Sequence, residues 1–126
     1  MNEVQSAEII KNLLAPFLEN GFVYRYFHEK GGDSSCVYIS RFQKGKDYFD
    51  WRETSGTNEI HFVVYAQGQF FFPSLEKRHA KEFRAFALKH IFKKASIDEK
   101  RNLYANALKT EWENAKPTGA FFGIAL

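Results

Sequence analysis

Asp50, Arg52 and His61 are the residues whose types and spacing suggest a chemical site. The planar guanidinium of Arg52 can hold an anionic group through paired hydrogen bonds. The imidazole of His61 exchanges protons near neutral pH, and a carboxylate such as Asp50 can orient or charge it. We hypothesise that these three residues form a ligand site, which in an enzyme would carry acid–base chemistry.

The segments on either side of the sequence SGTN must bring these residues together. With SGTN as a four-residue loop, a hairpin places Trp51 opposite Phe62 on an apolar face. A slip of one residue would point the side chain of Trp51 into solvent, which favours this register. Side chains alternate along a strand, so the other face receives the predicted ligand-binding residues: Tyr48, Asp50, Arg52, His61 and Tyr65.

The same face also has an ordinary structural interpretation, in which its residues are cross-strand pairs on a solvated sheet. Five of the six tyrosines lie on strand-like segments, which favours a binding platform: Tyr24, Tyr26, Tyr38, Tyr48 and Tyr65. Helices could instead cover this face and make it part of the core. The sequence leaves both arrangements open.

Turn-forming residues divide the middle of the chain into strand-like runs. The separators GGDSS, QKGK, SGTN and QG are rich in the residues that reverse a chain. Connections this short join antiparallel neighbours, because a parallel crossover needs about a dozen residues or more. We therefore expect an antiparallel meander sheet of four or five strands, formed by residues 22–29, 36–42, 47–54, 59–66 and 69–72.

The strand over residues 36–42 has two candidate registers. A two-residue Lys44-Gly45 turn places Tyr38 beside Trp51, whereas a three-residue loop places Ile39 there. We favour the three-residue loop because it also buries the apolar residues of this strand.

Three helices are expected around the sheet. Apolar residues at spacings of three and four predict a helix over 6–20, with a kink or early end at Pro16. Ser74 can cap a second helix over 75–94, and Ser96 with Glu99 forms a capping box for a third that ends near Ala115. The apolar tail TGAFFGIAL should dock on the body as an edge strand or an extended segment. The predicted fold class is α+β, with one N-terminal and two C-terminal helices packed mainly on one face.

Length and composition are typical of one globular domain over residues 1–126. Aromatic residues make up 17% of the chain, enough large rings to fill the core of a small domain. The first residues, MNEVQSAEII, lack the basic start and apolar run of a secretory signal. No stretch approaches the ~18–20 apolar residues of a membrane span. We expect a cytoplasmic protein with no membrane partner.

The net charge of +3 is unevenly distributed. Residues 74–110 carry ten Lys or Arg and four Asp or Glu, a net charge of +6. Nucleic-acid binding is therefore an alternative, with phosphates held by Lys77, Arg78, Lys81 and Arg84 on the helix 75–94. A solvated helix face is the simpler interpretation of these charges. The order of elements also differs from the common RNA-binding sheet module, which interleaves helices and strands.

No cofactor or metal motif stands out in the sequence. His79 and His90 are 11 residues apart on one predicted helix, about 16 Å along its axis, too far to share an ion. We expect neither a metal nor a cofactor. The leading hypothesis is a non-enzymatic binding domain that uses the tyrosine-rich face, or a groove at its edge, for a partner protein or a small anionic ligand. A homodimer is a further hypothesis, based on apolar residues left over on the last helix and the tail.

Overall fold

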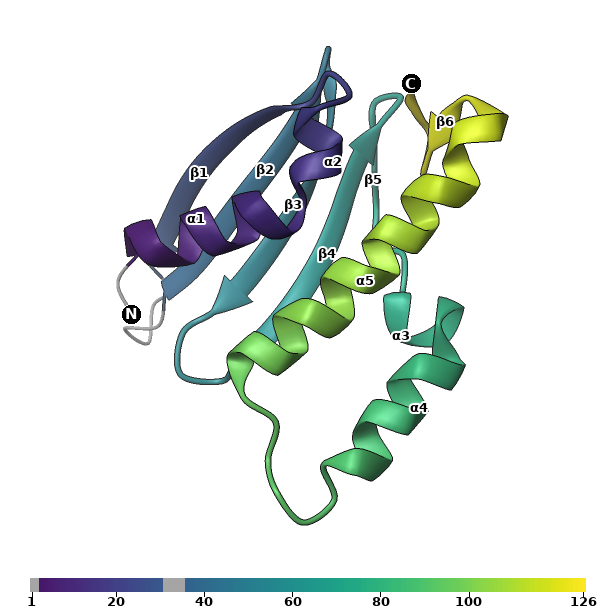
Figure 1. Cartoon of the computed structure of the whole chain (residues 1–126). Helices are drawn as coiled ribbons and strands as arrows, with labels where there is room; N and C mark the ends of the chain where they lie inside the picture. Colours follow the sequence, from purple (N-terminus) through teal and green to yellow (C-terminus); the bar gives the residue numbers. More distant parts are fainter. Residues whose placement is uncertain (1–2, 31–35) are drawn as a thin grey trace.

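The strands form one antiparallel sheet in meander order, β1-β2-β3-β4-β5 (Figure 1). The computed structural model describes residues 3–30 and 36–126, so the predicted GGDSS turn lies outside the described residues. The meander and the α+β class are as predicted. The strands are β1 (Val23–Lys30), β2 (Cys36–Lys44), β3 (Asp47–Thr54), β4 (Glu59–Ala66) and β5 (Gln69–Phe71).

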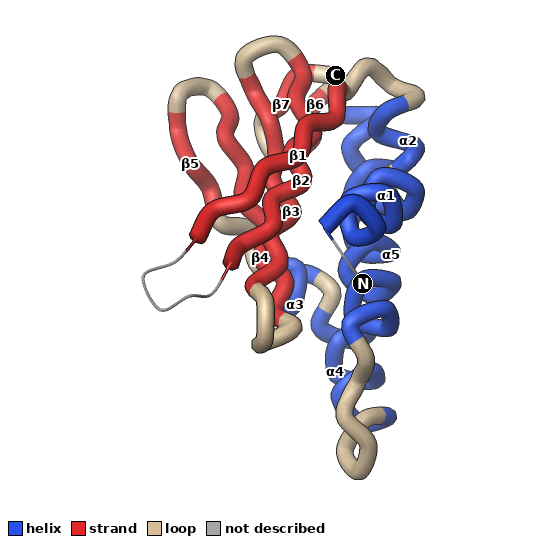
Figure 2. The backbone as a smooth tube through the Cα atoms, turned by 90° about the vertical axis from the view of Figure 1, so that its left-hand side faces the viewer, coloured by secondary structure: helices blue, strands red, loops and turns tan. Residues whose placement is uncertain are grey.

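The helices lie mainly on one side of the sheet, as Figure 2 shows for α1, α2 and α5. Pro16 breaks the N-terminal helix as expected, because its ring cannot continue a helical hydrogen-bond ladder. The helices and small terminal elements are α1 (Glu3–Leu13), α2 (Ala15–Leu18), α3 (Leu75–Arg78), α4 (Ala80–Lys89), α5 (Ile97–Ala115), η1 (Lys116–Thr118), β6 (Ala120–Phe121) and β7 (Ile124–Ala125). Within the described residues, no helix is long and apolar enough to cross a bilayer.

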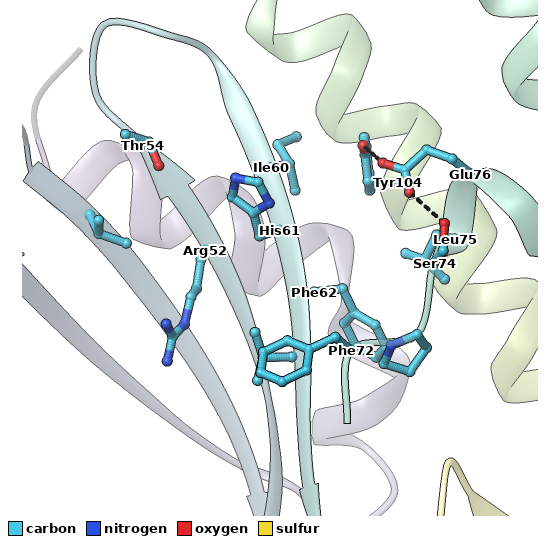
Figure 3. A pocket seen from close by; sticks show the side chains of 13 residues that line it. Arg52, Thr54, Ile60, His61, Phe62, Phe72, Ser74, Leu75, Glu76 and Tyr104 are labelled. Carbon is cyan, nitrogen blue, oxygen red and sulfur yellow. Dashed lines mark hydrogen bonds between the residues drawn. The ribbon is translucent and has the colours of Figure 1, made fainter. Parts of the chain in front are cut away.

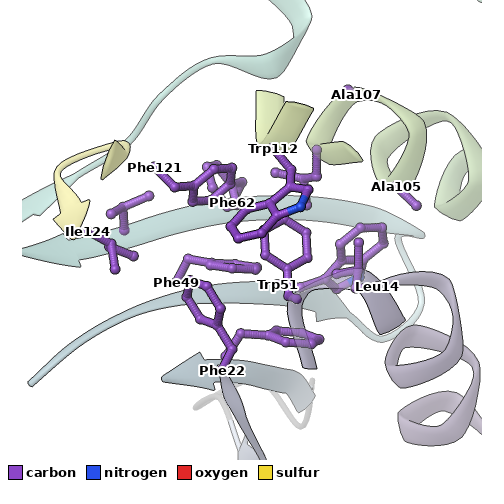
Figure 4. Close-up of a cluster of buried hydrophobic side chains, with 14 of the residues drawn as sticks. Leu14, Phe22, Phe49, Trp51, Phe62, Ala105, Ala107, Trp112, Phe121 and Ile124 are labelled. Atoms are coloured by element: carbon purple, nitrogen blue, oxygen red, sulfur yellow. The ribbon is translucent and has the colours of Figure 1, made fainter. Parts of the chain in front are cut away.

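Aromatic rings fill the space between the sheet and the helices (Figure 4). Phe17 is fully buried at the centre, with ring centroids 4.9 Å from Phe49, 4.9 Å from Trp112 and 5.1 Å from Phe121. Phe121 and Ile124 come from the tail, which folds into the small β6–β7 hairpin and docks as predicted. The apolar residues that suggested a homodimer are therefore largely buried within the chain itself. Dimerisation stays a prediction.

The register of β2 differs from both candidates. Lys44 pairs with Asp47 across a two-residue loop, so Ser40, not Ile39, faces Trp51. The favoured three-residue loop is wrong because Gly45, at φ +65°, occupies the first central position of a tight hairpin turn. A polar side chain is tolerated on the core face because the Ser40 hydroxyl lies 2.9 Å from the hydroxyl of Tyr24.

The predicted helix 75–94 is also wrong in extent. Ser74 caps its start as expected, accepting a hydrogen bond from the amide of Lys77. The helix then breaks at His79, whose ring nitrogen lies 2.7 Å from a carboxylate oxygen of Glu111 on α5. The second part, α4, ends at Lys89. A long-range polar contact and the change of direction it requires override the helical pattern.

A buried ion pair joins α5 to the sheet. Arg101 donates from Nε and Nη2 to the two carboxylate oxygens of Glu53, at 2.8 and 2.7 Å. Trp51 Nε1 donates to the same carboxylate at 2.9 Å. Both charged side chains are less than a tenth exposed. Hydrogen bonding to Glu53 raises the pKa of Arg101, which keeps this guanidinium charged.

Replacing Glu53 by Ala should destabilise the fold strongly, because it leaves the buried guanidinium of Arg101 without its main partner. We expect a loss of about 3–5 kcal/mol in the free energy of unfolding, measured by urea denaturation. The control is Glu113→Ala, which removes an exposed ion pair with Lys116 and should cost about 0–1 kcal/mol. Similar losses for the two variants would contradict a structural role for the Glu53–Arg101 pair.

Candidate functional site

The five predicted ligand-binding residues share the face of the sheet that points away from α1, α2 and α5, here called the outer face (Figure 2). The β3–β4 register is the one predicted, with Trp51 opposite Phe62 on the helix side. The structure therefore confirms their placement on one face and does not test their role in binding. The predicted residues form two cross-strand pairs with Asp50 between them: Tyr48 with Tyr65, and Arg52 with His61.

Asp50 is enclosed by two arginines. Its side chain is 1% exposed, and Arg41 holds it through Nε to Oδ1 at 2.8 Å and Nη2 to Oδ2 at 3.0 Å. Arg52 Nη2 lies 3.6 Å from Oδ2. The hydrogen bonds to Asp50 raise the pKa of Arg41. Asp50 is thus a buried counter-ion, with no exposed oxygen for a ligand.

Arg41 is the residue on this face that the sequence analysis missed. It lies directly opposite Asp50 in the β2–β3 ladder, a position that follows only from the two-residue turn at Gly45. Its guanidinium also stacks over the ring of Tyr48, 3.7 Å from the centroid. The sequence signal that predicts this position of Arg41 is the glycine at the first central position of the turn.

The outer face is less rich in tyrosine than expected. Tyr48 and Tyr65 stack on it, with ring centroids 5.2 Å apart. Tyr24, Tyr26 and Tyr38 instead alternate onto the helix side of β1 and β2. Of the five strand tyrosines, the predicted tyrosine-rich face therefore carries Tyr48 and Tyr65, because the register of β2 and alternation along β1 place the other three on the helix side.

His61 lies apart from Asp50. Its side chain is 57% exposed, and its Nε2 is 3.4 Å from Glu59 on the same strand. Arg52 is the cross-strand neighbour of His61, but among the contacts of the described residues His61 shares no hydrogen bond or ion pair with Asp50. The predicted Asp50–Arg52–His61 constellation is therefore divided, and only Arg52 and His61 border open space.

A hollow of about 450 Å³ lies beside Arg52 and His61 (Figure 3). It begins on the outer face against Val63 and Phe72 and continues round the edge of β4 to Leu75 and Tyr104, near α5. A second hollow of about 350 Å³ adjoins it and shares four of its lining residues, Ile60, His61, Glu76 and Tyr104. We call the two together the β4 groove.

The β4 groove exists because β5 is too short to cover β4. Strand β4 has eight residues, but β5 pairs only with the last three, Val64–Ala66. Pro73 follows soon after and cannot donate to a ladder, and the chain turns into α3. Residues 59–63 therefore have β3 on one side and, in the part of the chain that the structure describes, no strand on the other.

The β4–β5 turn determines which backbone groups face the groove. Gln67 and Gly68 form a two-residue loop with φ values of +54° and +78°. Such a turn is closed by a hydrogen-bonded pair, here Ala66 with Gln69. The N–H and C=O groups of Ala66 therefore point toward β5.

Every second residue of β4 points the same way as Ala66. Val64 still meets β5, but Phe62 and Ile60 lie beyond its end. Their N–H and C=O groups face the β4 groove. No backbone hydrogen bond outside the ladders involves either residue in the described segments. The groove thus has a row of donors and acceptors spaced for an extended chain.

The walls of the groove combine apolar and polar groups. Tyr104 donates a hydrogen bond to Glu76, and burial together with this carboxylate raises the pKa of Tyr104. Ser74 also donates to Glu76, at 3.3 Å (Figure 3). On the outer side, Nε of Arg52 is buried and has no hydrogen-bond partner among the residues that the structure describes. The Arg52 side chain as a whole is 35% exposed, so its guanidinium borders the groove.

The four basic residues predicted for nucleic-acid binding lie on two helices, α3 and α4, and not on one as predicted. Arg78 on α3 donates to both oxygens of Glu111, at 2.8 and 2.9 Å. Lys77, Lys81 and Arg84 are exposed. No group of three or more His, Cys, Asp or Glu within residues 3–30 and 36–126 is placed to hold a metal ion.

Asp50→Asn should destabilise the protein because it replaces the buried charge that holds Arg41 and Arg52. We expect a loss of about 1.5–3 kcal/mol in the free energy of unfolding, measured by urea denaturation. Glu59→Gln removes an exposed carboxylate from the neighbouring strand and should change it by about 0–0.5 kcal/mol. An Asp50→Asn variant as stable as the parent would show that this charge does not stabilise the fold.

Compared with known proteins, the sequence matches no protein-family model and no curated protein, and the structure matches no solved structure.

Proposed function

We propose that this protein is a non-enzymatic binding domain that takes up an extended segment of a partner protein in the β4 groove. The segment adds to the edge of β4 as a short strand, in line with β5. The observation that carries this proposal is the unpaired edge of β4 at Ile60 and Phe62, opening into a hollow of about 450 Å³. Unpaired strand edges are common sites of peptide addition, in which backbone hydrogen bonds supply affinity.

The dimensions suit a short segment. The uncovered part of β4, residues 59–63, is about 17 Å long at a rise of about 3.3 Å per residue. Side chains of an added strand alternate between the two sides of the sheet. On the outer side they would meet Phe72 and His61, and on the helix side Leu75 and Tyr104. These walls favour a segment with apolar residues in alternate positions.

The anion-binding part of the sequence hypothesis fits the outer end of the groove. The side chain of Arg52 is partly exposed, and that of His61 is largely exposed beside it. An acidic side chain or carbonyl of the bound segment could accept from both. By contrast, Asp50 is occupied by Arg41, which leaves the acid–base alternative without an accessible carboxylate at that position.

Backbone amides along β4 should differ in hydrogen exchange even without a ligand. Amides of Ile60 and Phe62 face the groove, whereas those of His61 and Val63 face β3, so the first pair should exchange at least about tenfold faster. Nuclear magnetic resonance of the labelled protein in deuterated water measures this. Equal protection of all four amides would show that the edge of β4 is not open.

Peptide binding should depend on Phe72, which is 73% exposed and lines the groove. Peptides selected from a phage-displayed library of random sequences should bind the parent protein, and Phe72→Ala should weaken binding about 10- to 100-fold by fluorescence polarisation. Phe70→Ala is the matched control, because Phe70 is 56% exposed on β5 but does not line the groove.

Both variants should retain the melting temperature of the parent. Selected peptides should also slow exchange of the Phe62 amide, which reports addition to the strand edge. Failure to enrich any peptide, or equal sensitivity of binding to the two substitutions, would contradict the proposed site.

A further inference from the structure

The connection between α4 and α5 projects from the body at the end opposite the β6–β7 hairpin (Figures 1 and 2). Helix α4 has no fully buried residue. Phe83 is its main aromatic contact with α5, with its ring centroid 5.1 Å from that of Tyr104. Most of the surface of α4 is therefore available to another molecule.

Three large apolar side chains are exposed on this projection and form what we call the apolar tip. Leu88 is 69% exposed, Ile91 61% and Phe92 fully exposed. All three lie in the five-residue segment 88–92, at the end of α4 and in the turn that follows it. Exposed apolar residues this close together are characteristic of an interaction site.

The backbone beside the apolar tip is held by specific contacts. His90 Nδ1 lies 2.8 Å from the carbonyl oxygen of Phe86, and Nε2 lies 2.8 Å from the Glu99 carboxylate on α5. Glu99 also accepts from the amide of Ser96 at the start of α5. These contacts raise the pKa of His90 and lower that of Glu99 to about 2. The tip is thus presented outward by hydrogen bonds on both sides of the turn.

Lysines flank the apolar tip along the chain, and the acidic group in contact with it is Glu99, which pairs with His90. Residues 77–94 contain seven Lys or Arg and one acidic residue, Glu82, a net charge of +6. Arg78 is paired with Glu111, but in the described structure the others form no ion pair: Lys77, Lys81, Arg84, Lys89, Lys93 and Lys94. Lys89, Lys93 and Lys94 directly flank the three apolar residues.

We propose that the apolar tip docks on the surface of an anionic lipid bilayer. Leu88, Ile91 and Phe92 enter the boundary between headgroups and acyl chains, and the flanking lysines contact lipid phosphates and carboxylates. Apolar side chains beside Lys and Arg are the pattern of surface-bound amphipathic segments. The lysine side chains are long enough to keep their ammonium groups at the headgroups while the tip is inserted.

The size and composition of the tip favour lipid over other partners. A stable protein interface buries about 1,200–2,000 Å² in total, far more than three side chains on a narrow projection provide. Single-stranded nucleic acid is bound by aromatic rings that stack on successive bases, whereas the tip offers the single ring of Phe92 beside the aliphatic Leu88 and Ile91. The earlier expectation of no membrane partner rested on the lack of a spanning segment, which does not bear on surface docking. This proposal is independent of the β4 groove.

Vesicle cosedimentation of the full chain tests the proposal. The protein should bind vesicles of phosphatidylcholine with roughly 30% phosphatidylserine and should bind pure phosphatidylcholine vesicles at least about tenfold more weakly. Phe92→Ser should lower the partition coefficient on the anionic vesicles about tenfold, whereas Phe70→Ser, an exposed aromatic far from the tip, should not change it. Lys93→Glu should reduce binding at least about fivefold, and Lys46→Glu, in the β2–β3 turn, should have little effect.

Other outcomes would overturn the docking proposal. If the protein does not bind the anionic vesicles at low salt, the docking proposal is wrong. Binding that Phe92→Ser leaves intact would show electrostatic adsorption without insertion. A single-stranded oligonucleotide that binds in a Lys93-dependent way, while the vesicles do not, would assign the basic surface to nucleic acid.

Discussion

The buried ion pair between Glu53 and Arg101 is the interaction on which the arrangement of the rest depends. It fixes α5 across the helix side of the sheet and gives the indole of Trp51 its hydrogen-bond acceptor. With α5 in place, Leu108 and Trp112 complete the aromatic core, and Tyr104 is brought to the edge of β4. A charge pair inside the core is satisfied only in this geometry, so it specifies the position of α5 in a way that apolar packing alone would not.

A second constraint, the early end of β5, gives the molecule its groove. Pairing stops at Val64, and Pro73 and the capped start of α3 direct the chain away from β4. Because the backbone groups of Phe62 and Ile60 then lack a neighbouring strand, the edge can accept an added one. The same change of direction, continued at His79 by its contact with Glu111, turns α4 away from the sheet and exposes the apolar tip. The groove and the tip thus have one structural origin.

Local patterns in the sequence predicted the order of the main helices and strands and the register of one hairpin. Period-two alternation around SGTN placed Trp51 opposite Phe62. The same alternation placed Asp50, Arg52 and His61 on the outer face. The capping box at Ser96 and the break at Pro16 also follow from short-range chemistry. These features were predictable because each depends on residues a few positions apart, where backbone geometry and burial leave one acceptable arrangement.

Contacts between distant residues were decided only by the tertiary structure. The sequence alone could not show that Asp50 would be enclosed by Arg41, because this depends on a one-residue difference in the β2–β3 turn. Nor could it show that Glu53 would pair with Arg101, 48 residues away, or that β5 would leave five of the eight residues of β4 uncovered. Composition and alternation determine which side chains can be buried or exposed on an element. Which partner a buried charge meets, and which strand edge stays open, depend on how elements far apart in the chain pack together.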